Sequence, residues 1–297
     1  MTGFSSSPLV GRDLAIGYSQ KLIIDGLDVS IADGEITTII GPNGCGKSTL
    51  LRGLGRLLRP SRGQVLLEGR DISTLRSRDV ARTLSVLPQS PSAPEGITVA
   101  DLVARGRHPH QSWLQQWSST DENETEAAME LTGMMELRDR PLEELSGGQR
   151  QRAWIAMTLA QDTSVLLLDE PTTYLDLAHA IEVLELVDHL NRELNRTVVM
   201  VLHDLNLAAR YSDRIIAMQD GAIKCIGTPE EILTQERLLD IFGTRSSARK
   251  KLFTKKNLEK SFLRYVREGG LEPPRPFEHT DLNRARLPIP PLTRGLS

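Results

Sequence analysis

Residues 41–49, GPNGCGKST, have the glycine spacing and the lysine of a loop that binds phosphate groups. The glycines let the backbone curl so that its N–H groups point at phosphate oxygens, and a helix beginning near Lys47 would add the positive end of its dipole. We expect Lys47 to reach the β- and γ-phosphates of a nucleoside triphosphate and the Ser48 hydroxyl to ligate Mg²⁺. The predicted phosphate contacts are Gly41, Pro42, Asn43, Gly44, Cys45, Gly46, Lys47, Ser48 and Thr49.

Two adjacent carboxylates, Asp169 and Glu170, follow the apolar run at residues 165–168. This run predicts a buried strand, and ligands of open parallel sheets bind at the carboxyl ends of the strands. We therefore expect Asp169 to hold Mg²⁺ through a water molecule and Glu170 to orient or deprotonate an attacking water. An acidic turn in solvent would be the default interpretation of an isolated Asp-Glu pair, but this pair accompanies a phosphate loop.

His203 comes one residue after another apolar strand, so it is expected at the same edge of the sheet as Lys47 and Asp169. This placement makes His203 a candidate for a contact with the γ-phosphate. A histidine that only caps the strand by hydrogen bonding is the alternative.

The elements that would hold these side chains follow the order of a parallel α/β domain. Short apolar runs and turn residues over residues 9–34 predict antiparallel strands, and residues 35–40 predict the strand before the phosphate loop. The helix after the loop is predicted from the spacing of Leu50, Leu51, Leu54, Leu57 and Leu58. Further strands are predicted at residues 64–68, 84–88, 164–168 and 197–202, with a helix over residues 177–194. A helix between two strands implies that the strands pair in parallel.

The composition divides the chain into segments. Residues 90–160 have a mostly helical and polar pattern, which predicts an inserted helical subdomain. Residues 244–297 carry 13 Lys and Arg against 5 Asp and Glu, a net charge of +8, whereas residues 1–243 carry −11. The end segment also contains proline-rich stretches that suit neither a helix nor a central strand. We therefore predict a folded domain over residues 1–243 and a basic, proline-rich tail over residues 244–297.

The apolar runs, the N-terminal residues and the cysteines indicate the cellular compartment of the protein. No apolar run approaches the ~20 residues of a membrane helix, and no basic segment leads into an apolar stretch at the N-terminus. The two cysteines, Cys45 and Cys225, cannot form a disulfide framework, which fits a reducing compartment. We expect a cytoplasmic protein in which Cys45 is a small filler of the phosphate loop rather than a reactive thiol.

A further glycine motif, LSGGQRQR at residues 145–152, precedes a helical stretch. A serine and two glycines before a helix form an anion-binding N-terminus, although a simple capped turn can have the same sequence. Between the phosphate loop and the VLLLDE strand at residues 165–170, the motif resembles the signature of ABC ATPases. The resemblance extends over residues 9–243, where five motifs occur in the order of that family.

The resemblance implies an α/β P-loop NTPase with a RecA-like core, an antiparallel β subdomain and a helical subdomain that carries the signature. It also implies a head-to-tail homodimer, in which each ATP lies between the phosphate loop of one copy and the signature of the other. The signature residues are Ser146, Gly147, Gly148 and Gln149.

The same resemblance assigns roles to further residues. Tyr18 matches the aromatic residue that stacks on adenine, although a tyrosine that only belongs to a strand is the alternative. Gln89 matches the glutamine that contacts Mg²⁺ and signals to a permease, and His203 matches the switch histidine. Leu175 and Asp176 match the loop that crosses the dimer interface. The implied catalytic residues are Glu170, His203 and Gln89, and the implied Mg²⁺ ligands are Ser48, Gln89 and Asp169.

The chain has one nucleotide domain and no membrane segment, so the resemblance implies an integral membrane permease and, indirectly, an external substrate-binding protein. Residues 85–89, 95–99, 105–110 and 171–177 are similar to ATPases of ferric-siderophore, haem and cobalamin import. Ferric siderophore is the predicted cargo, with cobalamin, haem or metal ions as alternatives. His108 and His110 invite a metal-ligand interpretation, but a solvated loop touching the permease is favoured because no further Cys or His clusters nearby.

ABC-type ATPases that act on DNA or ribosomes are the alternative class. Those that act on DNA separate the phosphate loop and the signature by long coiled coils, and a charge of −11 disfavours a DNA partner. The ribosomal factors carry two nucleotide domains in one chain. We therefore expect a protein at the cytoplasmic face of the membrane with no nucleic-acid partner.

Residues 244–297 do not resemble the endings of that family. The stretches at residues 269–277 and 283–291 resemble peptides translated by accident from a stable-RNA gene, which predicts a frameshifted or fused end. A flexible basic tail that touches anionic lipid near the permease is the functional alternative.

Overall fold

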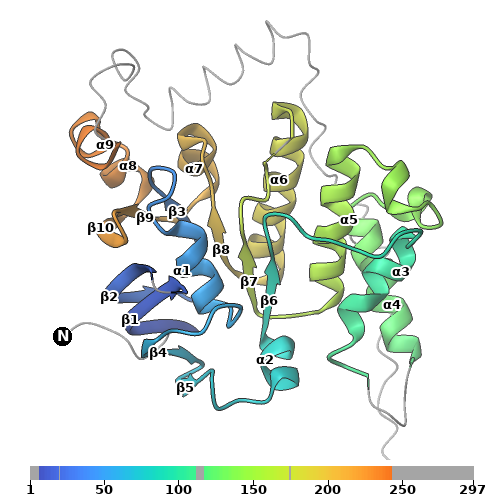
Figure 1. Ribbon diagram of the computed structural model, residues 1–297. Coiled ribbons are helices and arrows are strands. Elements are labelled where there is room, and N and C mark those ends of the chain that lie inside the picture. The colour runs from blue at the N-terminus through green and yellow to red at the C-terminus, as the bar shows by residue number, and fades with distance from the viewer. Residues whose placement is uncertain (1–6, 20, 112–116, 174, 243–297) are drawn as a thin grey trace, which may run out of the picture. The chain divides into compact units, whose positions relative to one another are not determined.

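Short apolar runs separated by turn residues near the start of the chain, together with residues 62–71, form an antiparallel sheet. The computed structural model describes residues 7–19, 21–111, 117–173 and 175–242, and the structural statements below concern these residues. β1 (Leu9–Tyr18) pairs with β2 (Lys21–Ile31) and with β4 (Arg62–Leu67), which pairs with β5 (Arg70–Asp71). The order is β2-β1-β4-β5 (Figure 1). The antiparallel strands predicted over residues 9–34 are confirmed.

The second sheet is mainly parallel, with the order β10-β9-β3-β8-β7-β6. Neighbouring strands pair in parallel except β9 and β10. The predicted strands correspond to β3, β6, β7 and β8, whereas β9 and β10 have no counterpart in the sequence predictions. The bounds are β3 (Ile36–Ile40), β6 (Leu84–Leu87), β7 (Val165–Leu168), β8 (Thr197–Val201), β9 (Arg214–Gln219) and β10 (Ala222–Gly227).

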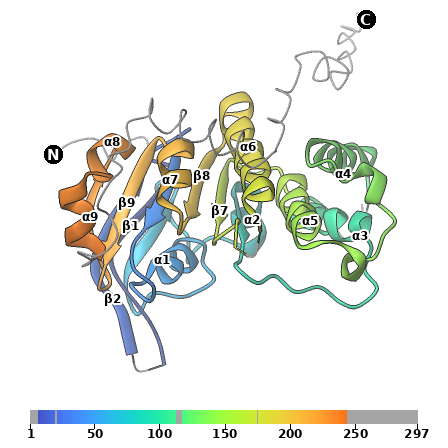
Figure 2. The same cartoon turned by 90° about the horizontal axis from the view of Figure 1, so that it is seen from above.

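Alternate residues of the central strands face two hydrophobic cores. In β7, Val165 and Leu167 belong to the core that contains the leucines of α1 (Lys47–Leu54) and the antiparallel sheet. Leu166 and Leu168 belong to the core formed with α6 (Leu177–Leu194) and α7 (Leu205–Tyr211). Figure 2 shows α6 and α7 on the opposite side of the sheet from α1. The strands β3, β7 and β8 are buried throughout because both faces of the sheet are covered.

The helix after the phosphate loop is shorter than predicted. α1 ends at Leu54, and Arg56, with a φ of +60°, has the left-handed conformation that terminates helices. The N–H groups of Leu57 and Leu58 both donate to the carbonyl oxygen of Arg52, and Leu57 is exposed. The extension of the helical face to Leu57 and Leu58 is therefore wrong.

The segment between β6 and β7 is helical. α3 (Val99–Ala104), α4 (Ser119–Leu131) and α5 (Gly147–Ala160) pack on one another and lie beside the parallel sheet in Figure 1. α4 and α5 each begin with a capping box, in which a serine and the residue three positions later satisfy each other's backbone N–H. The remaining helices and 3-10 turns are α2 (Ser77–Thr83), η1 (Arg105–Arg107), η2 (Met135–Leu137), η3 (Leu142–Glu144), α8 (Pro229–Ile232) and α9 (Gln235–Phe242).

A buried ion pair ties this helical segment together. The Nε of Arg107 donates to Oδ1 of Asp121 at 2.9 Å, and its Nη1 donates to the carbonyl oxygen of Ala160 at 2.8 Å. Burial raises the pKa of Asp121, but hydrogen bonds from Ser118 and Arg107 outweigh burial and hold the pKa below its usual value. Arg107 thus joins η1 to the start of α4 and the end of α5.

Replacing Arg107 with alanine should lower the free energy of unfolding by about 3–5 kcal/mol, because Asp121 would stay buried without its cation. Urea unfolding of the two proteins measures the difference. The control is Arg138→Ala, which removes a cation from the exposed pair with Glu126 and should cost about 0–1 kcal/mol. Equal losses in both variants would show that the buried pair does not hold the segment.

Candidate nucleotide site

The phosphate loop lies between β3 and α1. Gly46, which precedes α1, has a φ of +104°, a conformation that glycine adopts without strain. At Gly41, whose φ is +151°, a Cβ would lie 2.2 Å from the carbonyl oxygen of Met218. The Nζ of Lys47 donates to the carbonyl oxygens of Gly41 and Pro42, at 3.0 Å each. The lysine is therefore held across the loop, beside the helix N-terminus that favours phosphate.

Asp169 follows β7 and is 1% exposed. Neither of its carboxylate oxygens has a hydrogen-bond partner among the described residues, and the Nε of Arg52 lies 3.5 Å from Oδ2. Burial raises the pKa of this carboxyl group, against the opposing influence of Ser48 and Arg52. Buried carboxylate oxygens without a close hydrogen bond suit a hard cation such as Mg²⁺, and the Ser48 hydroxyl adds an oxygen ligand of the same kind. Asp169 and Ser48, two of the three predicted ligands, therefore suit the metal.

Glu170 is held by three side chains. Its Oε2 accepts from Nε2 of Gln89 at 2.6 Å and from Oγ1 of Thr173 at 2.9 Å, and its Oε1 lies 2.6 Å from Nε2 of His203. Burial raises the pKa of Glu170, but the hydrogen bonds from His203 and Thr173 outweigh burial, so the pKa is lowered. Glu170 is thus a carboxylate at neutral pH and can orient a water molecule or accept its proton.

Glu170, Gln89 and His203 line one cleft of about 500 Å³ together with residues of the phosphate loop. Tyr18 is half exposed there, as a ring that stacks on a base would be. Ile23 also lines the cleft and has no counterpart in the sequence predictions. The predicted residues that line it are Tyr18, Asn43, Gly44, Gly46, Lys47, Ser48, Thr49, Gln89, Glu170 and His203.

Three residues of the phosphate loop, Gly41, Pro42 and Cys45, and the predicted metal ligand Asp169 do not line the cleft. Cys45 is buried, and burial raises the pKa of its thiol, although the charge of Lys47 opposes this shift. A buried thiol with a raised pKa is unreactive, in agreement with the interpretation of Cys45 as a filler.

The signature residues lie away from this cleft. The Oγ of Ser146 accepts from the N–H of Gln149 at 3.2 Å, and the N–H of Ser146 donates to Oε1 of Gln149 at 3.0 Å. A Cβ at Gly148 would lie 2.7 Å from the ring of His179 in α6, so glycine allows α5 and α6 to approach closely. None of Ser146, Gly147, Gly148 and Gln149 lines the cleft, so a single chain does not bring the signature to its own phosphate loop.

Besides Ile23, two further side chains at the site are absent from the sequence predictions. Thr173 donates to Glu170, and the N–H of Thr173 also bonds to the Glu170 carbonyl oxygen at 3.2 Å, which is a turn contact between residues three apart. Arg52 approaches Asp169 from α1. Arg52 follows Ser48 by four residues, and this helical spacing could have placed it on the same face as the predicted metal ligand.

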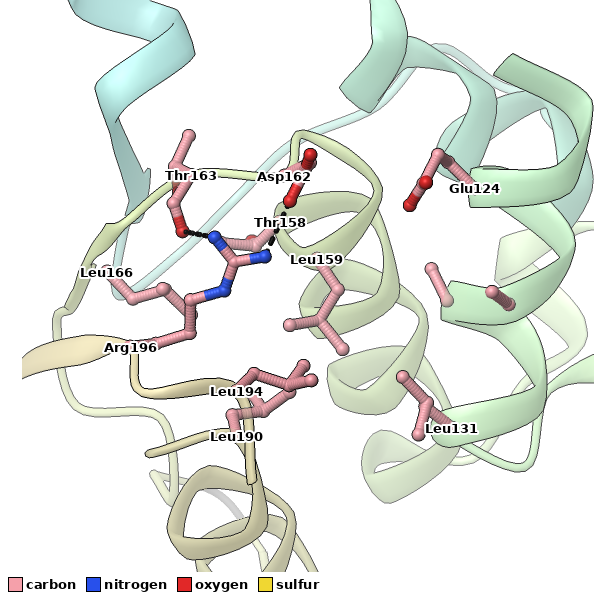
Figure 3. A pocket seen from close by; sticks show the side chains of 12 residues that line it. Glu124, Leu131, Thr158, Leu159, Asp162, Thr163, Leu166, Leu190, Leu194 and Arg196 are labelled. Carbon is pink, nitrogen blue, oxygen red and sulfur yellow. Dashed lines mark hydrogen bonds and ion pairs between the residues drawn. The ribbon is translucent and has the colours of Figure 1, made fainter. Parts of the chain in front are cut away.

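A smaller cavity of about 70 Å³ lies where α4, α5 and α6 meet. Figure 3 shows its mainly apolar lining, to which Leu131, Leu159 and Leu194 contribute. Arg196 at its edge donates to the carbonyl oxygen of Thr163 at 2.8 Å and pairs with Asp162. The cavity contains none of the predicted site residues.

The parallel sheet, the phosphate loop and the carboxylates at the strand ends define a P-loop nucleoside triphosphatase. The ABC transporter family matches residues 24–173. The chain is 56% identical to the "Probable siderophore transport system ATP-binding protein YusV" of Bacillus subtilis (strain 168), covering 80% of this chain and 86% of that protein. It is 50% identical to the ferric enterobactin transport ATP-binding protein FepC of Escherichia coli (strain K12), with 81% and 89% covered.

A solved structure shows the same fold. The protein cbiO1 of Clostridium perfringens, part of the ABC transporter complex cbiONQ, has a TM-score of 0.69 at 27% identity, covering 89% of this chain and 99% of that chain. The chain belongs to the ABC transporter family, as an ATP-binding subunit whose ATP hydrolysis is coupled to transport. The predicted fold class, the ATPase activity and the binding of ATP are confirmed.

Replacing Lys47 with alanine should weaken ATP binding about 10- to 100-fold, because a hydrogen bond to a charged group contributes about 1.5–3 kcal/mol. Equilibrium titration with a fluorescent ATP analogue measures the affinity. Lys224→Ala, which removes an exposed lysine from β10, should bind as the unchanged protein does. Unchanged affinity in Lys47→Ala would exclude Lys47 from the phosphate site.

Proposed function

We propose that this chain powers the import of ferric siderophores by hydrolysing Mg-ATP between two copies of itself. The two relatives described above are named for siderophore and ferric enterobactin transport, which supports this cargo. The observation that carries the catalytic part is the Glu170 carboxylate, which Gln89 holds at 2.6 Å in the same cleft as Lys47. Cobalamin, haem and metal ions are the alternative cargoes.

In the proposed mechanism the side chains of the cleft act on the nucleotide, on the attacking water or on the metal. Lys47 binds the β- and γ-phosphates, and Tyr18 stacks on the base. Glu170 orients the attacking water and accepts its proton, while His203, bonded to Glu170, contacts the γ-phosphate. Ser48, Asp169 and Gln89 would hold Mg²⁺, which when bound neutralises charge on the phosphates.

A second copy would complete each site. Ser146 and Gly147 are exposed at the N-terminus of α5, where backbone N–H groups and the helix dipole favour an anion. Because these residues lie outside the cleft of their own chain, we propose that they contact the ATP held by the partner copy. Asp176, which caps α6 by accepting from the N–H of His179 at 3.0 Å, would lie with Leu175 at the dimer interface.

An integral membrane permease is the proposed partner of the helical segment. An open groove of about 520 Å³ lies beside α3, with Ile97, His108 and the half-exposed Trp117 in its lining. The residues that line this groove follow Gln89 in the sequence, so a permease loop bound in the groove would respond to movement of the segment around Gln89.

His110, which invited a metal-ligand interpretation, already has a partner in the fold, because its Nε2 lies 2.9 Å from the Gln161 carbonyl oxygen. The described residues contain no group of three or more His, Cys, Asp and Glu that could hold a metal.

The proposed location is the cytoplasmic face of the membrane. Within the described ranges, no helix is long and apolar enough to cross a bilayer. We propose that the chain attaches through the permease, and that an external substrate-binding protein delivers the cargo to the permease without touching this subunit. We propose no nucleic-acid partner, because the residues before the tail carry a charge of −11.

Uptake of labelled ferric siderophore, cobalamin and haem tests this function in cells that lack the native gene. We expect the intact chain to restore siderophore uptake only, and Glu170→Gln to restore none, because loss of a general base costs about 10²–10⁴-fold in rate. Restoration of a different cargo would correct the substrate class, and full uptake with Glu170→Gln would remove Glu170 from catalysis.

Residues 244–297 lie outside the described residues, so the two interpretations of the tail remain predictions. The last described helix, α9, ends at Phe242, next to the predicted boundary. We propose residues 1–243 as the nucleotide-binding domain, with a helical subdomain over residues 90–160.

Deleting residues 244–297 should therefore leave the affinity for ATP unchanged, because all of the cleft residues precede the boundary. Titration of the full chain and of the truncated chain with the same ATP analogue measures the effect. Loss of binding in the truncated chain would overturn the proposed boundary. Vesicles that contain anionic lipid and bind only the full chain would support the lipid-binding alternative.

A further inference from the structure

Arg52 lies between two side chains that serve opposite ends of the nucleotide. Its Nε is 3.5 Å from Oδ2 of Asp169, and its Nη1 donates to the hydroxyl oxygen of Tyr18 at 3.4 Å. Asp169 is the predicted partner of the divalent cation, and Tyr18 is the predicted partner of the base. One guanidinium therefore contacts both the buried and the exposed part of the site.

Arg52 is one of two side-chain donors beside Asp169. Both carboxylate oxygens are buried without a close hydrogen bond, and the neighbouring donors are the Ser48 hydroxyl and the Arg52 guanidinium. The side chain of Arg52 is 36% exposed and that of Asp169 is 0% exposed, so the arginine extends from the solvent side to the buried carboxylate. Its position on α1, one turn after Ser48, places it on the same helical face as the proposed metal ligand.

The choice of arginine matters for this geometry. A guanidinium presents several N–H donors in a planar fork, so it can contact a carboxylate and a hydroxyl at the same time. A lysine ammonium carries the same charge as a single point and does not reproduce the fork.

We propose that Arg52 is a positioning residue that orients Asp169 toward the divalent cation and couples this carboxylate to Tyr18. The inference rests on the proposed function, in which Mg-ATP is the ligand. Binding of the base against Tyr18 then restrains the hydroxyl, the hydroxyl restrains Arg52, and Arg52 restrains Asp169. Cation binding thereby becomes sensitive to a side chain at the opposite end of the nucleotide.

The test measures how Mg²⁺ increases the affinity of the full chain for a fluorescent, non-hydrolysable ATP analogue, with EDTA as the zero point. Arg52→Gln should raise the Mg²⁺ concentration at half effect about tenfold, because the ion pair that orients the buried carboxylate is lost. Affinity in EDTA should change by less than about twofold, since the phosphate loop and the Tyr18 ring remain. Arg52→Lys should restore the Mg²⁺ response only in part, because lysine keeps the charge near Asp169 but lacks the planar fork.

The coupling is tested with Tyr18→Phe, which keeps the aromatic ring and removes only the hydroxyl. When Arg52 is present, this change should raise the Mg²⁺ concentration at half effect about threefold, as expected for the loss of a hydrogen bond from the hydroxyl. In the Arg52→Gln background the same change should have no effect, because the partner of the hydroxyl is already missing. Arg59→Gln, which removes an exposed arginine nearby, is the charge control and should respond as the unchanged protein does. Thermal unfolding midpoints near that of the unchanged protein confirm that the variants are folded.

The outcomes separate this inference from the proposed function. If Mg²⁺ does not increase the affinity of the unchanged protein, the proposed Mg²⁺ site fails. If the unchanged protein responds and Arg52→Gln responds at the same Mg²⁺ concentration, Arg52 has no positioning role. If Arg52→Gln does not fold, Tyr18→Phe by itself tests the coupling between Tyr18 and Asp169. An unchanged Mg²⁺ concentration at half effect in that variant would overturn the coupling.

Discussion

The site depends on the parallel pairing of β3, β7 and β8. Ile39 lies opposite Val201, and Leu168 lies opposite Met200, so the three strands end at nearly the same level. The phosphate loop, the two carboxylates and His203 each follow one of these strands, and they meet along one edge although they are far apart in the sequence. Burial of the strands on both faces holds this register, because the apolar side chains of each strand fill two cores.

The two neighbouring carboxylates have opposite surroundings. Burial raises the pKa of Asp169 against the weaker influence of Ser48 and Arg52, whereas Glu170 accepts hydrogen bonds that lower its pKa despite burial. A buried acceptor without a close hydrogen bond is suited to a cation, and a carboxylate held by Gln89 and His203 is suited to a water molecule. The backbone of Glu170 has a left-handed conformation, with a φ of +55°, so the chain turns between the buried Asp169 and the hydrogen-bonded Glu170.

The signature residues lie in the helical segment, outside the cleft that contains the phosphate loop. The N-terminus of α5 exposes Ser146 and Gly147, yet it does not reach the phosphate loop of the same chain. The approach of Gly148 to His179 and the ion pair between Arg152 and Glu182 connect α5 to α6. Because Ser146 and Gly147 lie outside the cleft of their own chain, the position of this helix N-terminus supports the proposed head-to-tail pairing, in which hydrolysis requires two copies.

The sequence by itself determined the features whose signals are local. The phosphate loop, the strands β3, β7 and β8 and the helix α6 follow from glycine spacing and short apolar runs. The end of α1 was mispredicted because leucine spacing alone does not show the left-handed backbone at Arg56. The hairpin of β9 and β10 has a local signal, since Asp220 and Gly221 stand between its strands, but half of β10 is exposed and its apolar pattern is weak.

Only the tertiary structure decided which groups surround each carboxylate. Gln89, His203 and Arg52 come from segments distant in sequence from Asp169 and Glu170, and their contacts depend on how the strands and α1 pack. Sequence motifs identify the carboxylates but not the donors around them, because hydrogen bonding and burial at a strand end are set by long-range packing rather than by neighbouring residues. For that reason the distinct electrostatic states of Asp169 and Glu170, and the position of Arg52 between Asp169 and Tyr18, became visible only in the folded chain.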